Sequence, residues 1–303
     1  MSNRFKLFGF AALIAFIGFF TPIGKFVKNK VDYIEHIQKP IAKSSMIDSF
    51  DRDIQYLLVY NPDNHKYQGR NEKVVPESLA SLVKVLIAFA TVKELEKGNL
   101  SPSEKLDFED WDAGGHDAVG NTVEEAMFHM LNSSSNSATN VLIEKLGGFD
   151  SINAILRKNR FKSTFILCEL GPAQQDELKC EGKNESTLLE MTKAFEYLVS
   201  DKGKFNYLAQ KPMEKTIFPY SHTNRLMNKT GINSKVIGNI ALVEIDGQKY
   251  IISAIFADPP QADRFDNLTE NDKIRENTDP KSKTDPISRV TQEVINALND
   301  VKL

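Results

Sequence analysis

The fold is organised around the stretch Ser81-Leu82-Val83-Lys84-Val85-Leu86-Ile87-Ala88-Phe89-Ala90-Thr91-Val92. This stretch is apolar almost throughout and carries a single lysine, Lys84. A segment that is apolar on all sides predicts a helix buried on all sides. Side chains three residues apart share a helix face, so the Lys84 amine can reach the Ser81 hydroxyl. Burial disfavours the charged form of a lysine and so makes it a base. The stretch therefore predicts a buried serine–lysine pair. The alternative is a serine that caps the helix beside a lysine that extends to solvent.

The 303-residue chain has an ordinary globular composition, with 41% hydrophobic and 26% charged residues. This length is enough for one large domain or two small ones. Residues 31–303 carry 33 basic and 41 acidic side chains, a net charge of −8. That acidic balance excludes a generally basic surface of the kind that binds nucleic acid, and we expect no nucleic-acid partner.

The first thirty residues differ from the rest, with five basic and no acidic side chains. Within them Leu7 to Ile23 is apolar and follows Arg4 and Lys6, which is typical of an export signal. No small-x-small cleavage site follows before Lys25, so an uncleaved membrane anchor is favoured over a cleaved signal. We therefore expect residues 1–30 to be a signal or anchor, residues 31–50 a spacer, and the remainder to be periplasmic or otherwise extracytoplasmic.

Cys168 and Cys180 lie twelve residues apart in a stretch without periodicity that reads as a long loop. In an exported protein such a local pair suggests a disulfide that closes the loop, and two free thiols remain the alternative. The five histidines are scattered without metal-ligand spacing. We expect no metal site and no cofactor.

The pattern of the first two thirds predicts a hairpin followed by helices. Strands at 55–60 and 67–75 flank the turn Asn61-Pro62-Asp63-Asn64. Gly98 ends the helix that carries Lys84, and Thr122-Val-Glu-Glu125 is a capping box that opens another helix. Further helices are predicted over 137–146, from an N-cap at Asp150, and over 187–199.

The last third returns to strands, at 236–245 and 250–258, joined by the hairpin dipeptide Asp246-Gly247. A polar loop at 259–286 and an amphipathic helix at 287–301 follow. Strands at both ends with helices between them predict a mixed α and β fold. In it, an antiparallel sheet of about five strands (51–80 and 216–303) is flanked by helices, with an all-helical insertion (81–215) and a cleft between the two parts.

Three motifs occur in order, Ser81-Leu-Val-Lys84, Ser134-Ser135-Asn136 and Lys229-Thr230-Gly231. This set resembles the active-site serine penicillin-recognising superfamily, and most of all the class A β-lactamases. The residues after the second motif, Asn136 to Ile143 and then Leu146-Gly147-Gly148, are also similar to that family. The resemblance covers about residues 50 to 300.

The resemblance implies roles that match the residue types. Ser81 is the nucleophile, Lys84 its base, and Ser134 the relay of a proton to the leaving nitrogen. The backbone N–H groups of Ser81 and Ile232 form the oxyanion hole. Lys229 and Thr230, followed by Gly231, hold the substrate carboxylate, and Asn136 binds the acylamino group. The implied partner is a small-molecule β-lactam or a D-alanyl peptide.

Three positions depart from the class A pattern. The glutamate that activates the hydrolytic water falls near Gly171 by position, whereas this chain has Glu169 two residues earlier, with Glu177 as a weaker candidate. Ser135 stands where aspartate is usual, and Ile232 replaces a small or hydroxylic residue. All three departures bear on fast antibiotic hydrolysis and leave acylation of Ser81 untouched.

The first functional interpretation is therefore β-lactam hydrolysis through a Ser81 acyl-enzyme. The alternative is a penicillin-binding D-alanyl-D-alanine peptidase or related cell-wall serine hydrolase. A second alternative is a sensor domain that binds β-lactams or peptidoglycan without turnover.

Overall fold

The computed structural model describes residues 39–40, 54–106, 119–171, 180, 182–214, 223–233, 235–245 and 247–257. The chain divides into two units, Met1–Lys39 and Pro40–Leu303, and the second contains the sheet and helices described below. The predicted N-terminal anchor, the 259–286 loop and the 287–301 helix lie outside the described residues. Among the residues that are described, no helix is both long enough and apolar enough to span a membrane.

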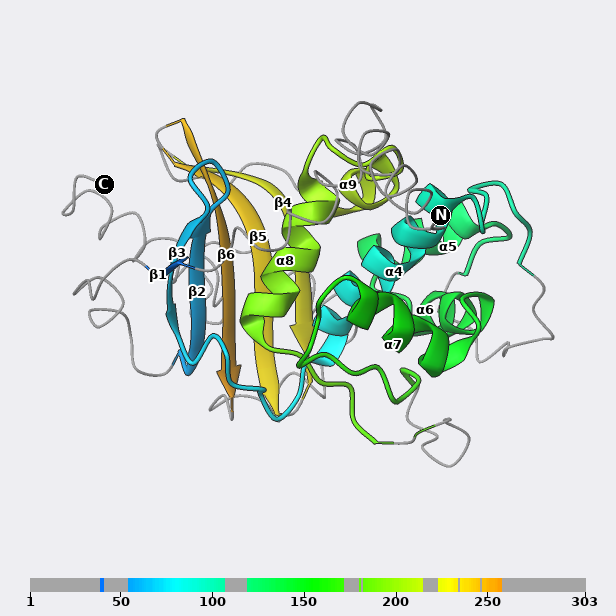
Figure 1. Ribbon diagram of the computed structural model, residues 1–303, viewed down its shortest axis with the longest axis horizontal. Coiled ribbons are helices and arrows are strands. Elements are labelled where there is room, and N and C mark those ends of the chain that lie inside the picture. Colours follow the sequence, from blue (N-terminus) through cyan, green and yellow to red (C-terminus); the bar gives the residue numbers. More distant parts are fainter. Residues whose placement is uncertain are drawn as a thin grey trace, which may run out of the picture. The chain divides into compact units, whose positions relative to one another are not determined.

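The sheet is built from both ends of the second unit. After a two-residue strand β1 (Lys39–Pro40), β2 (Tyr56–Asn61) and β3 (Lys66–Arg70) form a hairpin. β4 (Thr223–Ile232), β5 (Val236–Ile245) and β6 (Gln248–Ala257) come from the C-terminal part. The antiparallel pairs β3–β2, β2–β6, β6–β5 and β5–β4 join these five strands in one sheet, which confirms the predicted fold class (Figure 1).

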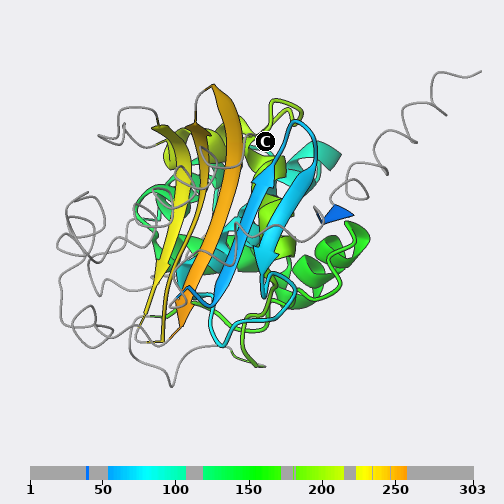
Figure 2. The same cartoon turned by 90° about the vertical axis from the view of Figure 1, so that its left-hand side faces the viewer.

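The central strands β5 and β6 are buried on both faces, as continuous Val, Ile and Leu runs predict. One face carries an apolar cluster that includes Leu57, Val243 and Ile252. On the other face lies helix α8 (Leu188–Val199), where Thr192 Oγ1 and Ser253 Oγ are 2.7 Å apart. The described helices stand on one side of the sheet, and Figure 2 shows the sheet in front of them.

Helix α4 (Lys84–Lys97) is the centre of the helical part. It contacts α5 (Val123–Asn132), α6 (Asn136–Lys145), α7 (Gly148–Lys158) and α8, and it is buried from Lys84 to Val92. A short helix, α9 (Tyr207–Met213), packs on α5 and α8. The apolar run from 82 to 92 thus forms the predicted all-round buried helix, and Gly98 ends it with φ 77°.

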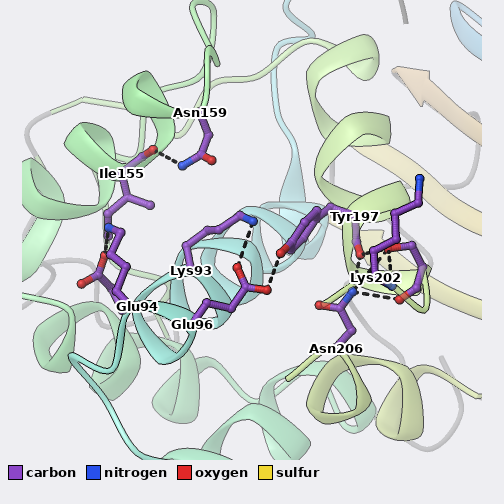
Figure 3. A network of polar contacts seen from close by, with 10 residues as sticks. Lys93, Glu94, Glu96, Ile155, Asn159, Tyr197, Lys202 and Asn206 are labelled. Carbon is purple, nitrogen blue, oxygen red and sulfur yellow. Dashed lines mark hydrogen bonds and ion pairs between the residues drawn. The ribbon is translucent and has the colours of Figure 1, made fainter. Parts of the chain in front are cut away.

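The contact between α4 and α8 is aromatic inside and polar at its rim. Phe89 and Tyr197 meet edge to face with ring centroids 5.4 Å apart, and Lys93 Nζ lies 3.3 Å from the Tyr197 ring centroid. Glu96 accepts hydrogen bonds from both Lys93 Nζ and Tyr197 Oη (Figure 3). Lys93, the second lysine of α4, is therefore held by an acidic and an aromatic side chain.

Several predicted boundaries are confirmed and others are wrong. Thr122 is the predicted N-cap, with Glu125 N donating to Thr122 Oγ1 at 3.3 Å, while the Glu125 carboxylate accepts from Asn121 N rather than from Thr122 N. The return strand of the hairpin ends at Arg70 rather than at residue 75, because the backbone turns at Asn71 with φ 51°. Asp150 is not an N-cap: α7 begins at Gly148 after Gly147, and Asp150 lies in its first turn. The 216–235 region holds β4, which the sequence did not predict as a strand.

Candidate active site

Ser81 and Lys84 are held by a 3₁₀ turn, η2 (Ala80–Val83), that runs directly into α4. Ser81 is inside this turn and caps no helix, and Lys84 is the first residue of α4 with 0% exposure. Lys84 Nζ lies 3.2 Å from Ser81 Oγ. The alternative of a capping serine beside a solvent-exposed lysine is therefore wrong, because Lys84 is itself fully buried with its amine at the Ser81 hydroxyl.

The contacts of the Lys84 amine include four oxygen atoms. Two can only accept hydrogen bonds, Asn136 Oδ1 at 2.7 Å and the Ser134 carbonyl. The other two belong to hydroxyls, Ser81 Oγ at 3.2 Å and Ser134 Oγ at 3.1 Å. A neutral amine can donate through its two N–H groups to acceptors such as these and can offer its lone pair to a hydroxyl proton. Lys84 is thus placed to take a proton from one serine and deliver it to the other.

Ser134 brings the second and third motifs together. Its hydroxyl accepts a hydrogen bond from Lys229 Nζ at 2.9 Å, and Lys229, only 2% exposed, also donates to the Thr230 carbonyl at 2.8 Å. The Ser134 backbone has φ 62°, in the left-handed region that non-glycine residues avoid and that is concentrated at functional sites. All three sequence motifs therefore meet at one hydroxyl.

Ser135, the residue that departs from the usual aspartate, has a structural role. It is fully buried and is the N-cap of α6, where its Oγ accepts from Ala138 N at 2.9 Å. Serine and aspartate are about equally good N-caps. The departure at Ser135 therefore carries less information about substrate than the sequence alone indicated.

The oxyanion hole expected between Ser81 and Ile232 is consistent with the backbone geometry. Among the described strands β4 is an edge strand, paired with β5 on one side only. Just after it, Asn233 N donates to Val236 O of β5 at 3.0 Å. Successive N–H groups of a strand point to opposite sides, so the Ile232 N–H points away from β5. Ser81 lies in the first turn of a helix, where N–H groups have no partner within the helix.

Gly231 brings these two backbones together. A Cβ atom at this position would lie 2.7 Å from Leu82 N and 2.9 Å from Leu79 O. Strand β4 therefore rests directly on η2, and only glycine permits this approach. The side chains of Thr230 and Ile232 are half-buried, and their contacts with a substrate stay predictions.

The loop that carries Glu169 is tied to the site by asparagines. Asn136 Nδ2 donates to Gly171 O at 3.3 Å, and Asn140, one turn later, bonds both Leu170 N and Leu170 O, at 2.8 and 2.7 Å. Glu169 is 6% exposed. Two residues of chain span at most about 7 Å, so the Glu169 Cα lies within about that distance of the Cα of Gly171, whose carbonyl Asn136 contacts.

Two more asparagines hold the preceding part of this loop, and neither they nor Asn140 were predicted from the sequence. Asn153 bonds Ile166 N and O, both at 2.8 Å, and Asn184 Oδ1 accepts from Leu167 N and Cys168 N. Cys168 and Cys180 form a disulfide, which confirms the first of the two sequence alternatives. Asn140 and Asn153 lie on helices and Asn184 in the loop itself, so no shared sequence pattern marked the three.

The described residues contain no cluster of His, Cys, Asp and Glu that could hold a metal ion. Glu177, the weaker candidate for the water-activating base, lies outside the described residues. The contacts among Ser81, Lys84, Ser134 and Lys229 are compatible with nucleophilic attack by Ser81, proton transfer through Lys84 and Ser134, and anion binding at Lys229.

Comparison with known proteins agrees with this geometry. The family model of Beta-lactamase2, the beta-lactamase enzyme family, matches residues 41–294. No curated protein sequence matches the chain.

Solved structures show the same fold at low identity. A mutant of the class A β-lactamase of the last common ancestor of Gram-negative bacteria is 18% identical with a TM-score of 0.60, covering 80% of this chain and 92% of that one. The β-lactamase of Sphaerobacter thermophilus DSM 20745 is 16% identical with a TM-score of 0.60, covering 81% of this chain and 92% of that one. PBP-A is 17% identical with a TM-score of 0.59, covering 89% of this chain and 97% of that one. With a family match over most of its length and this fold, the chain belongs to the beta-lactamase enzyme family.

Proposed function

We propose that this protein hydrolyses β-lactams through an acyl-enzyme formed on Ser81. Family and fold support a serine hydrolase of the β-lactamase or penicillin-binding type. The observation that carries the proposal is the position of Lys84 Nζ, which is 3.2 Å from Ser81 Oγ and 3.1 Å from Ser134 Oγ, while Lys229 Nζ is 2.9 Å from Ser134 Oγ.

The proposed acylation uses these groups in sequence. Lys84 takes the Ser81 proton as Ser81 Oγ attacks the lactam carbonyl carbon, and the N–H groups of Ser81 and Ile232 bind the resulting oxyanion. The carbon–nitrogen bond then breaks, and the nitrogen receives the proton from Lys84 through Ser134. The Lys229 ammonium binds the carboxylate of the substrate. A water molecule, activated by Glu169, finally hydrolyses the Ser81 ester.

The test uses the full chain with a fluorescent penicillin and a chromogenic cephalosporin. Labelling of Ser81, located by mass spectrometry, with rapid hydrolysis of the cephalosporin supports the proposal. Ser81→Ala is expected to lose both labelling and hydrolysis. A wild-type protein that is never labelled, or a Ser81→Ala variant that still hydrolyses substrate, would refute it.

Glu169→Gln tests the second half of the reaction. Because the amide cannot accept a proton from water, the acyl-enzyme is expected to persist, with deacylation slowed by roughly 10²- to 10⁴-fold and acylation unchanged. The measurement is the lifetime of the Ser81 adduct by intact-protein mass spectrometry. Glu185→Gln, at a half-buried position whose carboxylate pairs with Lys183 at 3.4 Å, is the control and should deacylate at the wild-type rate. An unchanged lifetime in Glu169→Gln would remove Glu169 from the mechanism.

A specific observation also favours the alternative of a D-alanyl-D-alanine peptidase. The residues whose backbones Asn140 and Asn136 fix beside the site are Leu170 and Gly171, and neither carries a carboxylate. If Glu169 does not reach the hydrolytic water, the β-lactam label stays on Ser81. Release of D-alanine from a D-alanyl-D-alanine peptide then identifies the peptidase, and its absence identifies the non-catalytic sensor.

We also propose that the catalytic part acts outside the cytoplasm. The Cys168–Cys180 disulfide supports this, because disulfides persist in oxidising compartments. Fractionation of cells expressing the full chain is expected to place it in an extracytoplasmic, membrane-associated fraction. Recovery in the cytoplasmic fraction with both cysteines reduced would contradict the proposal.

A further inference from the structure

The two halves of the oxyanion hole belong to different parts of the chain, and a side-chain hydrogen bond joins them at one end. Asn233 follows Ile232, and its Nδ2 donates to Ser78 Oγ at 2.9 Å. Ser78 Oγ also accepts from Ala80 N at 3.2 Å, and Ala80 precedes Ser81. The connection thus runs from Asn233 through Ser78 to Ala80. Asn233 is next to Ile232 and Ala80 is next to Ser81, the two residues whose N–H groups form the hole.

The β4 end of the connection is rigid because the Asn233 side chain also holds the turn to β5. Its Oδ1 accepts from Lys235 N and Val236 N, both at 3.0 Å, while its backbone N donates to Val236 O. The amide group is thus fixed by the turn before it reaches Ser78. Such side-chain to backbone bonding is a common function of asparagine in turns.

The η2 end is a backbone that needs support. Ala80 has φ 44°, a left-handed conformation in which an alanine is strained. Its N–H is held by Ser78 Oγ, the atom that Asn233 contacts. Since Gly231 and Leu82 already press the two backbones together, the Asn233–Ser78 bond supplies a second fixed point and so sets their relative orientation.

We propose that Asn233 and Ser78 are positioning residues for acylation, and that their hydrogen bond sets the spacing of the Ser81 and Ile232 N–H groups. This inference rests on the proposed acyl-enzyme function. A hole with misplaced donors stabilises the tetrahedral intermediate less while the substrate is still bound at Lys229. The role therefore predicts a loss in the acylation step and none in the preceding non-covalent complex.

The test compares Ser78→Ala, Asn233→Ser and the double variant. Ser78→Ala removes Ser78 Oγ, which accepts from both Asn233 Nδ2 and Ala80 N. Asn233→Ser keeps an oxygen that can accept from the N–H groups of the turn, but its side chain is too short to reach Ser78. Each is expected to lower the acylation rate constant at saturating fluorescent penicillin about tenfold, with the dissociation constant of the non-covalent complex within twofold of wild type. Because both act through one bond, the double variant should be no slower than the slower single variant.

Two further variants serve as controls. Ser78→Thr keeps the hydroxyl and should restore the acylation rate. Lys235→Ala removes the ion pair between Lys235 and Glu77, at 2.5 Å, which also joins the β4–β5 turn to the segment before η2. Both side chains are more than half exposed, and exposed ion pairs contribute little to stability. Its acylation rate should equal that of wild type. Thermal unfolding of each variant identifies any loss of folding, and Asn233→Ser decides the question if Ser78→Ala does not fold.

The outcomes separate this inference from the proposed function. If wild-type protein is not acylated, the proposed function is wrong, and so is the positioning role of Asn233 and Ser78. If wild-type protein is acylated and both single variants react within twofold of its rate, only the positioning role is wrong. Losses that multiply in the double variant, or a weaker non-covalent complex in place of slower acylation, also overturn it.

Discussion

Lys84→Met is expected to abolish acylation of Ser81 while the protein stays folded. Methionine fills a similar volume but accepts no proton, so the rate of labelling by fluorescent penicillin should fall by roughly 10²- to 10⁴-fold, the range for loss of a general base. The Ser134 carbonyl and Asn136 Oδ1 each lose the hydrogen bond from Lys84, and a buried acceptor left unsatisfied costs about 1–3 kcal/mol of unfolding free energy. Removal of a buried amine offsets part of that cost.

The matched control is Lys93→Met, the same change on the same helix. Lys93 is outside the site, pairs with Glu96 at 3.1 Å and stacks on Tyr197 (Figure 3). This variant should label Ser81 within about twofold of the wild-type rate, because neither the pair nor the ring touches the reacting atoms. A Lys84→Met protein that is folded by circular dichroism and labels as fast as Lys93→Met would exclude Lys84 as the base.

Gly231→Ala is expected to slow acylation by about 10- to 100-fold through a steric effect alone. The added methyl group would lie 2.7 Å from Leu82 N and 2.9 Å from Leu79 O, and these backbone atoms cannot rotate out of the way as a side chain could. Strand β4 must therefore move away from η2, which separates the Ile232 and Ser81 N–H groups. A displacement of about 1 Å is enough for such a loss. Labelling kinetics measure it directly.

Gly247→Ala separates this effect from a general loss of stability. Gly247 has φ 79° in the β5–β6 turn, with no atom within 4 Å of an added Cβ. Alanine is strained in that conformation, so the melting temperature should fall by a few degrees, equivalent to about 1 kcal/mol. Acylation should be unaffected. If the two variants lose the same fraction of acylation, spacing at Gly231 is not the cause.

Predictions from sequence succeeded where a local pattern was sufficient. The all-apolar run after Ser81, the N-cap at Thr122 and the β5–β6 strands depend on neighbours within a few residues, and all three are present. The motif order also indicated which residues meet at Lys84. β4 was missed because its residues, Thr223-Asn-Arg-Leu-Met-Asn-Lys-Thr-Gly-Ile232, are polar and lack strict alternation, so its strand conformation depends on pairing with β5.

The asparagines were missed for a related reason. Asn140, Asn153 and Asn184 each bond the backbone of a segment 13 to 30 residues away. Asparagine in a single sequence indicates a turn or a cap far more often than such a clamp. No local pattern distinguishes the two uses, because the partner is a backbone group that every residue possesses.

The sequence by itself indicated the family and predicted the nucleophile and its base, because Ser81-x-x-Lys84 and its two partner motifs are carried by residue type and order. Only the tertiary structure decided the state of those groups: that Lys84 is fully buried against Ser134 and Asn136, that Ser135 is a helix cap, and that Asn233, which follows β4, bonds Ser78, which precedes η2. The physical reason is distance along the chain. Ser78 and Asn233 are 155 residues apart, and only the closure of the sheet from both ends brings them together.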